Sequence, residues 1–298
     1  MAELAKNAAE ISKVHPEDTA SPLKEAWRAF CKNRLALAGL GIVIFFIIIA
    51  ILAPVIAPYS FKEQELTKRL LAPSSEHWFG TDDFGRDIFS RIVYGARISL
   101  WVGFFAVLGS AVLGTILGVI AGYYGRWLDT VISRTFDIML AFPSILLAIA
   151  VVAILGPSLQ NALIAIAIIN IPNFGRLVRS KVLSVKQEEY IMAARAVGMK
   201  DSRILMHHIL PNSMTPIIVQ STLAIATAII EAAALGFLGL GAQAPSPEWG
   251  KMLADSKQYL VQAPWTLFFP GLAIMLTVLG FNLMGDGLRD VLDPKMKQ

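Results

Sequence analysis

YIMAARAVGMKDSRILMHHILP, residues 190–211, is a polar segment between two long apolar stretches, and this position decides the fold. Gly198 suits the left-handed backbone that ends a short helix, and Asp201 or Ser202 can cap a second helix. Pro211 is expected to end that second helix. The segment therefore predicts two short helices at an angle, a shape that can fill a cleft on another subunit. An ordinary basic loop is the alternative interpretation.

The composition of the whole chain is typical of a membrane protein rather than a soluble one. Of 298 residues, 55% are apolar and 16% charged, and the mean hydropathy is +0.60. Such values predict several membrane spans. The excess of basic over acidic residues is small, 26 against 22, and we expect no nucleic-acid partner. Cys31 is the single cysteine, which excludes an internal disulfide.

Six apolar runs are long enough to cross the hydrocarbon core, which takes about twenty helical residues. We therefore expect an all-α polytopic membrane protein with six transmembrane helices. The residues before the first run contain no signal-peptide core, so that run is expected to direct insertion. The runs are Leu35–Ala57, Ile98–Ala121, Ile138–Leu155, Gln160–Gly175, Met214–Leu235 and Trp265–Met284.

The distribution of Lys and Arg predicts the orientation. With the N-terminus in the cytosol, the inner segments hold 18 of these residues and the outer segments 8. The positive-inside rule then places both termini in the cytosol. The inner segments are 1–34, 123–137, 176–213 and 285–298, and the outer ones are mainly 59–97 and 240–264. Trp101, Trp249 and Trp265 are expected at the outer interface and Trp127 at the inner one.

The expected organisation follows from these segments. Residues 1–34 form a cytosolic tail whose basic, amphipathic part, with Leu23, Trp27 and Phe30 on one face, lies along membrane lipid. Residues 35–57 form the first transmembrane helix, 58–97 an extracytoplasmic connection and 290–298 a cytosolic C-terminus. Residues 98–289 form a five-helix transmembrane core that includes the cytosolic loop 176–213.

The second half of the outer connection is expected to be helical from Thr81 or Asp82. Asp82, Asp83 and Asp87 then lie in the first turns, where the helix dipole favours carboxylates. A metal or acid–base site is the alternative interpretation of the same residues. We favour capping.

Enzyme signatures are absent from the sequence. It contains no H-E-x-x-H, no G-x-S-x-G and no phosphate-binding G-x-x-x-x-G-K-[ST] loop. Asp137 and Asp286 raise the possibility of an intramembrane aspartyl protease. Each lies at a cytosolic interface three residues from an arginine, Arg134 or Arg289, so a surface ion pair is the simpler interpretation. We expect no metal and no cofactor bound by this chain.

Small residues recur every four positions in the second span, at Ser110, Gly114, Gly118 and Gly122. Such a stripe lets another helix approach closely, and we favour packing over pore lining. Pro143 and Pro172 predict kinks in the third and fourth spans.

The fifth span carries Gln220, Thr227 and Glu231 at intervals of seven and four, so these residues share one face. Glu231 is the one ionisable side chain well inside a predicted span, where a carboxylate is costly unless it is paired, protonated or hydrated. Two interpretations stay open. The face borders a translocation pathway, or Glu231 satisfies free backbone donors in the turn Gly236–Gly241.

Several stretches resemble one family of membrane proteins. Ala193, Ala194, Gly198, Leu210 and Pro211 keep the A-A-x3-G-x11-L-P spacing of the EAA loop of ATP-binding-cassette (ABC) importer permeases. Residues 79–100, 233–253 and 281–294 are more specific and resemble permeases for dipeptides and oligopeptides, especially the C-type subunit of the dipeptide system. The chain departs from the loop pattern at Met192, which replaces its glutamate, and at His208.

The resemblance implies a type I importer fold and a non-catalytic pore subunit in the bacterial inner membrane. It also implies a second homologous permease, two cytosolic ATPases that bind ATP and Mg, an extracytoplasmic peptide-binding protein and a peptide substrate. The residues that couple to the ATPases would be Tyr190, Ala193, Ala194, Arg195, Gly198, Leu210 and Pro211. The alternatives are a self-contained secondary transporter, or an ABC permease for a haem precursor, an antimicrobial peptide or a nickel chelate.

Overall fold

The computed structural model describes residues 22–292, and the predictions for 1–21 and 293–298 lie outside this part of the chain. Within it, five helices are long and apolar enough to cross a membrane, and one bent pair brings the total to as many as six. The all-α membrane fold is therefore confirmed. The five contain α3 (Arg34–Ile51), α5 (Ile88–Tyr124), α8 (Leu159–Val185), α11 (Leu210–Phe237) and α13 (Trp265–Leu292), and the bent pair is α6 (Arg126–Ala141) and α7 (Ser144–Leu155).

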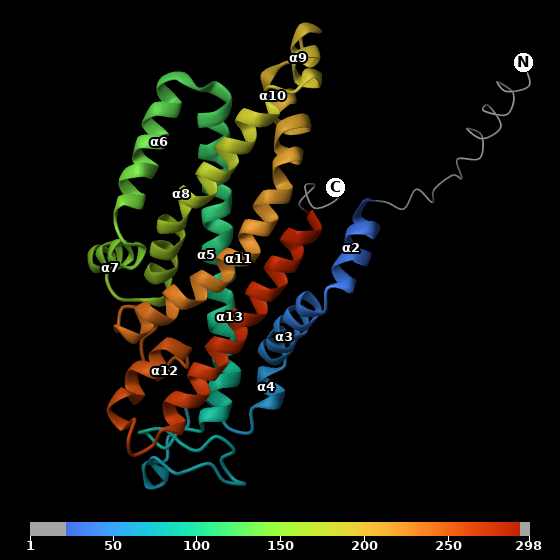
Figure 1. Ribbon diagram of the computed structural model, residues 1–298. Helices are drawn as coiled ribbons and strands as arrows, with labels where there is room; N and C mark the ends of the chain where they lie inside the picture. The colour runs from blue at the N-terminus through green and yellow to red at the C-terminus, as the bar shows by residue number, and fades with distance from the viewer. Residues whose placement is uncertain (1–21, 293–298) are drawn as a thin grey trace, which may run out of the picture.

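Short helices lie at both ends of this bundle (Figure 1). At one end lie α9 (Glu189–Ala196) and α10 (Asp201–Ile204), followed by a π-helical turn, η2 (Leu205–Ile209). At the other end lie α12 (Trp249–Ser256) and the connection that follows α4. The remaining short elements are α2 (Pro22–Lys32), α4 (Ala53–Ile56), η1 (Leu66–Lys68) and η3 (Lys257–Tyr259).

The predicted third span is not one straight helix. α6 ends at Ala141, α7 begins at Ser144, and the two helices meet at an angle of 98°. Pro143 explains the break, because it cannot donate the backbone hydrogen bond and it disfavours a helical conformation at Phe142, whose ψ is 142°. Pro172, in contrast, lies inside the continuous helix α8.

The predicted helix start at Thr81 or Asp82 is wrong. α5 begins at Ile88, and the Asp87 carboxylate caps it by accepting from the Ser90 N–H at 2.7 Å. Asp82 instead stabilises a loop by accepting from the N–H groups of Phe84 and Arg86, both at 2.9 Å. Gly85, with a φ of +73°, continues this loop. The capping that we expected is therefore found at Asp87, whereas Asp82 stabilises the loop before the helix.

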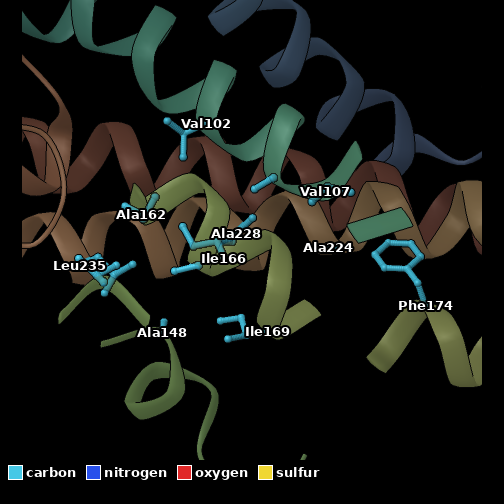
Figure 2. Close-up of a cluster of buried hydrophobic side chains, with 14 residues drawn as sticks. Val102, Val107, Ala148, Ala162, Ile166, Ile169, Phe174, Ala224, Ala228 and Leu235 are labelled. Carbon is cyan, nitrogen blue, oxygen red and sulfur yellow. The ribbon is translucent and has the colours of Figure 1, made fainter. Parts of the chain in front are cut away.

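The stripe of small residues on α5 lies against α8. A Cβ on Gly114, Gly118 or Gly122 would come within 3 Å of α8 atoms, so the two backbones approach closely here. The main apolar core continues from this contact. Figure 2 shows side chains from α5, α7, α8 and α11 meeting in it, among them Val102, Ala148, Ile166 and Ala228.

Two expected interfacial aromatic residues are buried in protein. Trp249 is fully buried, and its indole donates to the Ile92 carbonyl at 3.1 Å. Phe30 on α2 is 6% exposed and lies beside Gly287 of α13, whereas Trp27 is 57% exposed. The prediction that Phe30 faces lipid is therefore wrong, because α13 covers that side of α2.

Candidate transport and coupling sites

The predicted coupling segment forms a helical hairpin at one end of the bundle (Figure 1). α9 ends at Ala196, and Gly198 takes the left-handed conformation with a φ of +79°. A Cβ on Gly198 would meet no atom within 4 Å, so the turn is open to solvent or a partner. The glycine is therefore required here by backbone conformation rather than by crowding.

The second part of the hairpin differs from the prediction. Pro211 does not end a helix, because it lies in the first turn of α11, where proline is well tolerated. Residues Asp201–Phe237 therefore run as one continuous helical segment of 37 residues. Lys200 holds the N-cap position of α10 without a side-chain cap bond, so neither Asp201 nor Ser202 acts as the cap.

The hairpin has an inner and an outer side. Ala194 and Ile191 are buried against α8, while Ala193, Arg195 and Tyr190 are exposed. Large apolar side chains also lie on the outside, and the sequence analysis did not single them out for docking. Met192 is 55% exposed, Met206 62% and Val197 80%. Such exposure at a polar end of the bundle is typical of an interaction surface.

Tyr123, near the end of α5, fastens the hairpin to the membrane helices. Its hydroxyl donates to the Asp201 carboxylate, and the Arg195 guanidinium lies 5.3 Å from its ring centre. The Lys186 ammonium donates to the Tyr123 carbonyl at 2.6 Å. Sequence reasoning missed this cluster because Tyr123 and Asp201 lie 78 residues apart.

Gln220, Thr227 and Glu231 all line one cavity of about 330 Å³ beside the bend between α6 and α7. Three polar residues from other helices join them there. These are Ser144 at the start of α7 and Asn170 and Asn173 on α8. The structure therefore brings the predicted polar face together with groups that sequence spacing did not connect to it.

Glu231 is held by a neighbouring helix, not by the glycine turn. The Asn170 amide donates to Glu231 Oε2 at 2.9 Å and to the Ile166 carbonyl at 3.0 Å. The acidic side chain beside the turn Gly236–Gly241 is Glu248, which caps α12 rather than satisfying donors of the turn. Its carboxylate lies against Gly236 and accepts from the N–H groups of Gly250 and Lys251, both at 2.8 Å. Burial raises the pKa of Glu248.

A second, more open cleft of about 580 Å³ lies between α8, α11 and α13. Its charged lining groups are Lys181 and Arg289, and Asn212 and Thr215 add polar atoms. Gln220 lines both this cleft and the first cavity. One side chain of α11 therefore borders both spaces.

The opposite end of the bundle contains a buried charged network. Asp82 accepts from Arg86 Nε at 2.6 Å and lies 3.5 Å from Arg91 Nε, while His77 Nδ1 lies 3.0 Å from Asp87. Burial and the nearby Asp82 raise the pKa of Asp83. No group of three His, Cys, Asp or Glu side chains suited to a metal occurs among residues 22–292. The network joins the connection that follows α4 to the first turns of α5.

The two aspartates considered for proteolysis do not face each other as a pair. Asp137 makes ion pairs with Arg176 and Arg134, the second at 3.7 Å. The expected pairing of Asp286 with Arg289 is not formed within 4 Å in the described part of the chain. Asp286 is nevertheless exposed, so it needs no partner.

Comparison with protein families gives two matches that together span most of the chain. Residues 114–298 match the family described as binding-protein-dependent transport system inner membrane component. Residues 21–73 match the N-terminal transmembrane domain of oligopeptide transport permease C.

Curated relatives match over nearly the whole length. The chain is 70% identical to the dipeptide transport system permease protein DppC of Alkalihalophilus pseudofirmus, over 95% of this chain and 94% of the relative. It is 50% identical to the protein of the same name from Haemophilus influenzae, over 93% of this chain and 96% of the relative. It is also 50% identical to the glutathione transport system permease protein GsiD of Escherichia coli, over 95% and 94%.

Solved structures support the fold. A chain from an inward-facing structure of the MetNI methionine ABC transporter superposes with a TM-score of 0.56 at 20% identity. The match covers 68% of this chain and 97% of the other. The membrane helices therefore share an importer permease architecture.

Proposed function

Because the chain belongs to the family of binding-protein-dependent transport system inner membrane components, we propose that it is one of two permease subunits of an ATP-driven importer for dipeptides or short oligopeptides. It is a multi-pass membrane permease of peptide-transport type. The curated relatives named above support the substrate class. Two are named for dipeptide transport and one for glutathione transport.

One observation carries the mechanism. The second arm of the hairpin, α10, and the polar face of Gln220, Thr227 and Glu231 lie on the same continuous helical segment, Asp201–Phe237. A displacement of α10 by an ATPase is therefore transmitted along this segment, through the π-helical turn and past Pro216, to Gln220, Thr227 and Glu231. The cavity then opens to one side of the membrane or to the other, and this chain catalyses no reaction. Such a rigid shift of packed helices is an ordinary route for alternating access.

The partners follow from the same mechanism. A second homologous permease supplies the other wall of the pathway, and two cytosolic ATPases bind ATP and Mg and dock on the hairpin. An extracytoplasmic binding protein delivers peptide at the end that carries α12. This chain acts as a non-catalytic subunit with both termini in the cytosol of a bacterium, and its sequence lacks a phosphate-binding loop.

Reconstitution in proteoliposomes tests this function. The chain with its second permease, both ATPases and the binding protein should take up radiolabelled dipeptide, and vanadate should stop uptake. The chain alone should take up none. Vanadate-insensitive uptake by the isolated chain would instead support a self-contained secondary transporter.

The substrate class has its own test in the same liposomes. Unlabelled dipeptides and tripeptides should compete with the labelled dipeptide, whereas a haem precursor, an antimicrobial peptide or a nickel chelate should not. ATP-driven uptake of one of those three compounds, with no uptake of dipeptide, would refute the peptide assignment and leave the permease mechanism intact.

A further inference from the structure

The cavity and the open cleft, both of which Gln220 lines, have charged lining residues of opposite sign. Among the described residues that line the cavity of about 330 Å³, Glu231 is the ionisable one, and the rest are neutral. The cleft of about 580 Å³ is lined by Lys181 and Arg289, with no carboxylate among its described lining residues. Along α11 the order is therefore a cleft lined by cations, the neutral Gln220 and a cavity lined by a carboxylate.

The Glu231 carboxylate is fixed in place but has acceptor capacity left. Both hydrogens of the Asn170 amide are used, one by Glu231 Oε2 and one by the Ile166 carbonyl. Asn170 is 8% exposed, so it cannot easily turn away. An ionised carboxylate offers about four acceptor sites, and the Asn170 amide and the Ser144 hydroxyl take two of them. The Glu231 carboxylate therefore keeps some acceptor capacity in the cavity that it lines with Thr227.

A carboxylate in this position favours a cationic ligand. Removal from water is costly for an unpaired charge within a membrane, and an ammonium group that enters the cavity compensates part of that cost. An ammonium has three donors, which the carboxylate and the neutral oxygens of the cavity can accept together. The two cations of the open cleft favour a carboxylate for the same electrostatic reason.

Resting on the transport function proposed above, we propose that Glu231 binds the protonated amino terminus of the peptide, and that Lys181 and Arg289 receive its carboxylate beyond Gln220. The passage thereby selects for peptides with both ends free. The relatives named for dipeptide and glutathione transport carry substrates with free amino and carboxylate groups, which agrees with this chemistry.

A short peptide makes the contact with Glu231 and the contact with Lys181 and Arg289 one after the other, because the two sites are far apart. Gln220 and Glu231 are eleven positions apart on α11, or about 16 Å along the helix axis. An extended dipeptide spans at most about 7 Å. The amino terminus is therefore released from Glu231 before the carboxylate reaches the cationic cleft, and neither contact traps the peptide.

The test uses the complete transporter with its binding protein saturated by each of three probes. These are alanyl-alanine, its N-acetyl derivative and its C-terminal amide, and saturation removes differences in their affinity for the binding protein. The wild type should transport the free dipeptide roughly tenfold faster than the N-acetyl form, because the latter loses a charge-assisted contact. Equal rates for the two would overturn the proposal, without any variant being needed.

Variants then test which residues cause the preference for free peptide ends. Glu231→Gln should bring the ratio of the two rates close to one, and Glu231→Asp should restore most of the preference. Lys181→Gln with Arg289→Gln should slow the free dipeptide but not the C-terminal amide. An intact Glu231→Gln complex that keeps the wild-type ratio would refute the role of Glu231. Complete absence of peptide uptake by the wild type would instead refute the transport function itself.

Discussion

Replacement of Gly118 by alanine tests the close contact between α5 and α8. A Cβ at this position would lie 2.5 Å from the Gly175 carbonyl oxygen and 2.9 Å from Val178 Cβ. Ordinary contacts begin at 3.4 Å, so the first of these is nearly 1 Å too short. The obstructing oxygen belongs to the backbone and cannot rotate away. The helices must separate, and overpacking of this kind typically costs about 1–3 kcal/mol.

Gly109 provides a matched control on the same helix. A Cβ there would lie 3.5 Å from the Ala167 Cβ, which is an ordinary contact. Gly109→Ala should therefore be neutral or slightly stabilising, because alanine favours a helix over glycine by roughly 0.5–1 kcal/mol. The two variants make the same chemical change against the same neighbouring helix and differ in the space available.

Thermal unfolding of the purified transporter in detergent distinguishes the two variants. Intrinsic fluorescence, and size-exclusion chromatography after heating, should show a fall in the Gly118→Ala midpoint of roughly 2–8 °C. Gly109→Ala should unfold at or above the wild-type midpoint. Midpoints for the two variants that agree within about 1 °C would refute the claim that the close approach of these backbones is essential.

Three further predictions concern coupling and topology. Tyr123→Phe keeps the ring but removes the hydrogen bond from the hydroxyl to Asp201, so transport per ATP hydrolysed in proteoliposomes should fall several-fold. An unchanged ratio of transport to ATP hydrolysis would contradict the role of this hydrogen bond. Gly198→Asp forces a side chain into the left-handed conformation at a cost of about 1 kcal/mol, so it should uncouple or detach the ATPases. An intact complex with normal transport would refute the assignment of this hairpin as the contact with the ATPases. With the native cysteine replaced by serine, a cysteine at Lys257 should react with an impermeant maleimide in spheroplasts, whereas a cysteine at Lys200 should not. The reverse labelling pattern would mean that the chain crosses the membrane in the opposite orientation.

Features encoded by neighbouring residues could be predicted from the sequence. The length of each apolar run determines whether a helix can cross the membrane, so all the spans except the bent third one were predictable one by one. The left-handed turn at Gly198 and the interruption at Pro143 depend on local backbone preferences, and both occur in the structure. The small residues on α5 were recognisable from their four-residue spacing alone.

Predictions from neighbouring residues were wrong where the same residues are compatible with two different local structures. The sequence predicts the helix cap at Thr81 or Asp82, whereas the fold uses Asp87 for α5 and Asp82 for a loop. Pro211 is compatible with the end of one helix or the first turn of the next, and the structure has the second arrangement. A choice of this kind depends on which backbone conformation the surrounding contacts favour.

Tertiary structure alone decided which distant polar groups meet. Asn170 and Glu231 are 61 residues apart, and no spacing rule relates positions on two different helices. The same holds for the burial of Trp249 beside Ile92 and for the position of Glu248, not Glu231, against Gly236. The sequence by itself determined the position of five of the six expected spans and which helix faces are polar, whereas the third is a pair of helices that meet at 98°. Helix packing decided which of those faces share a cavity, because pairing between helices depends on their relative position and rotation rather than on the period of either one.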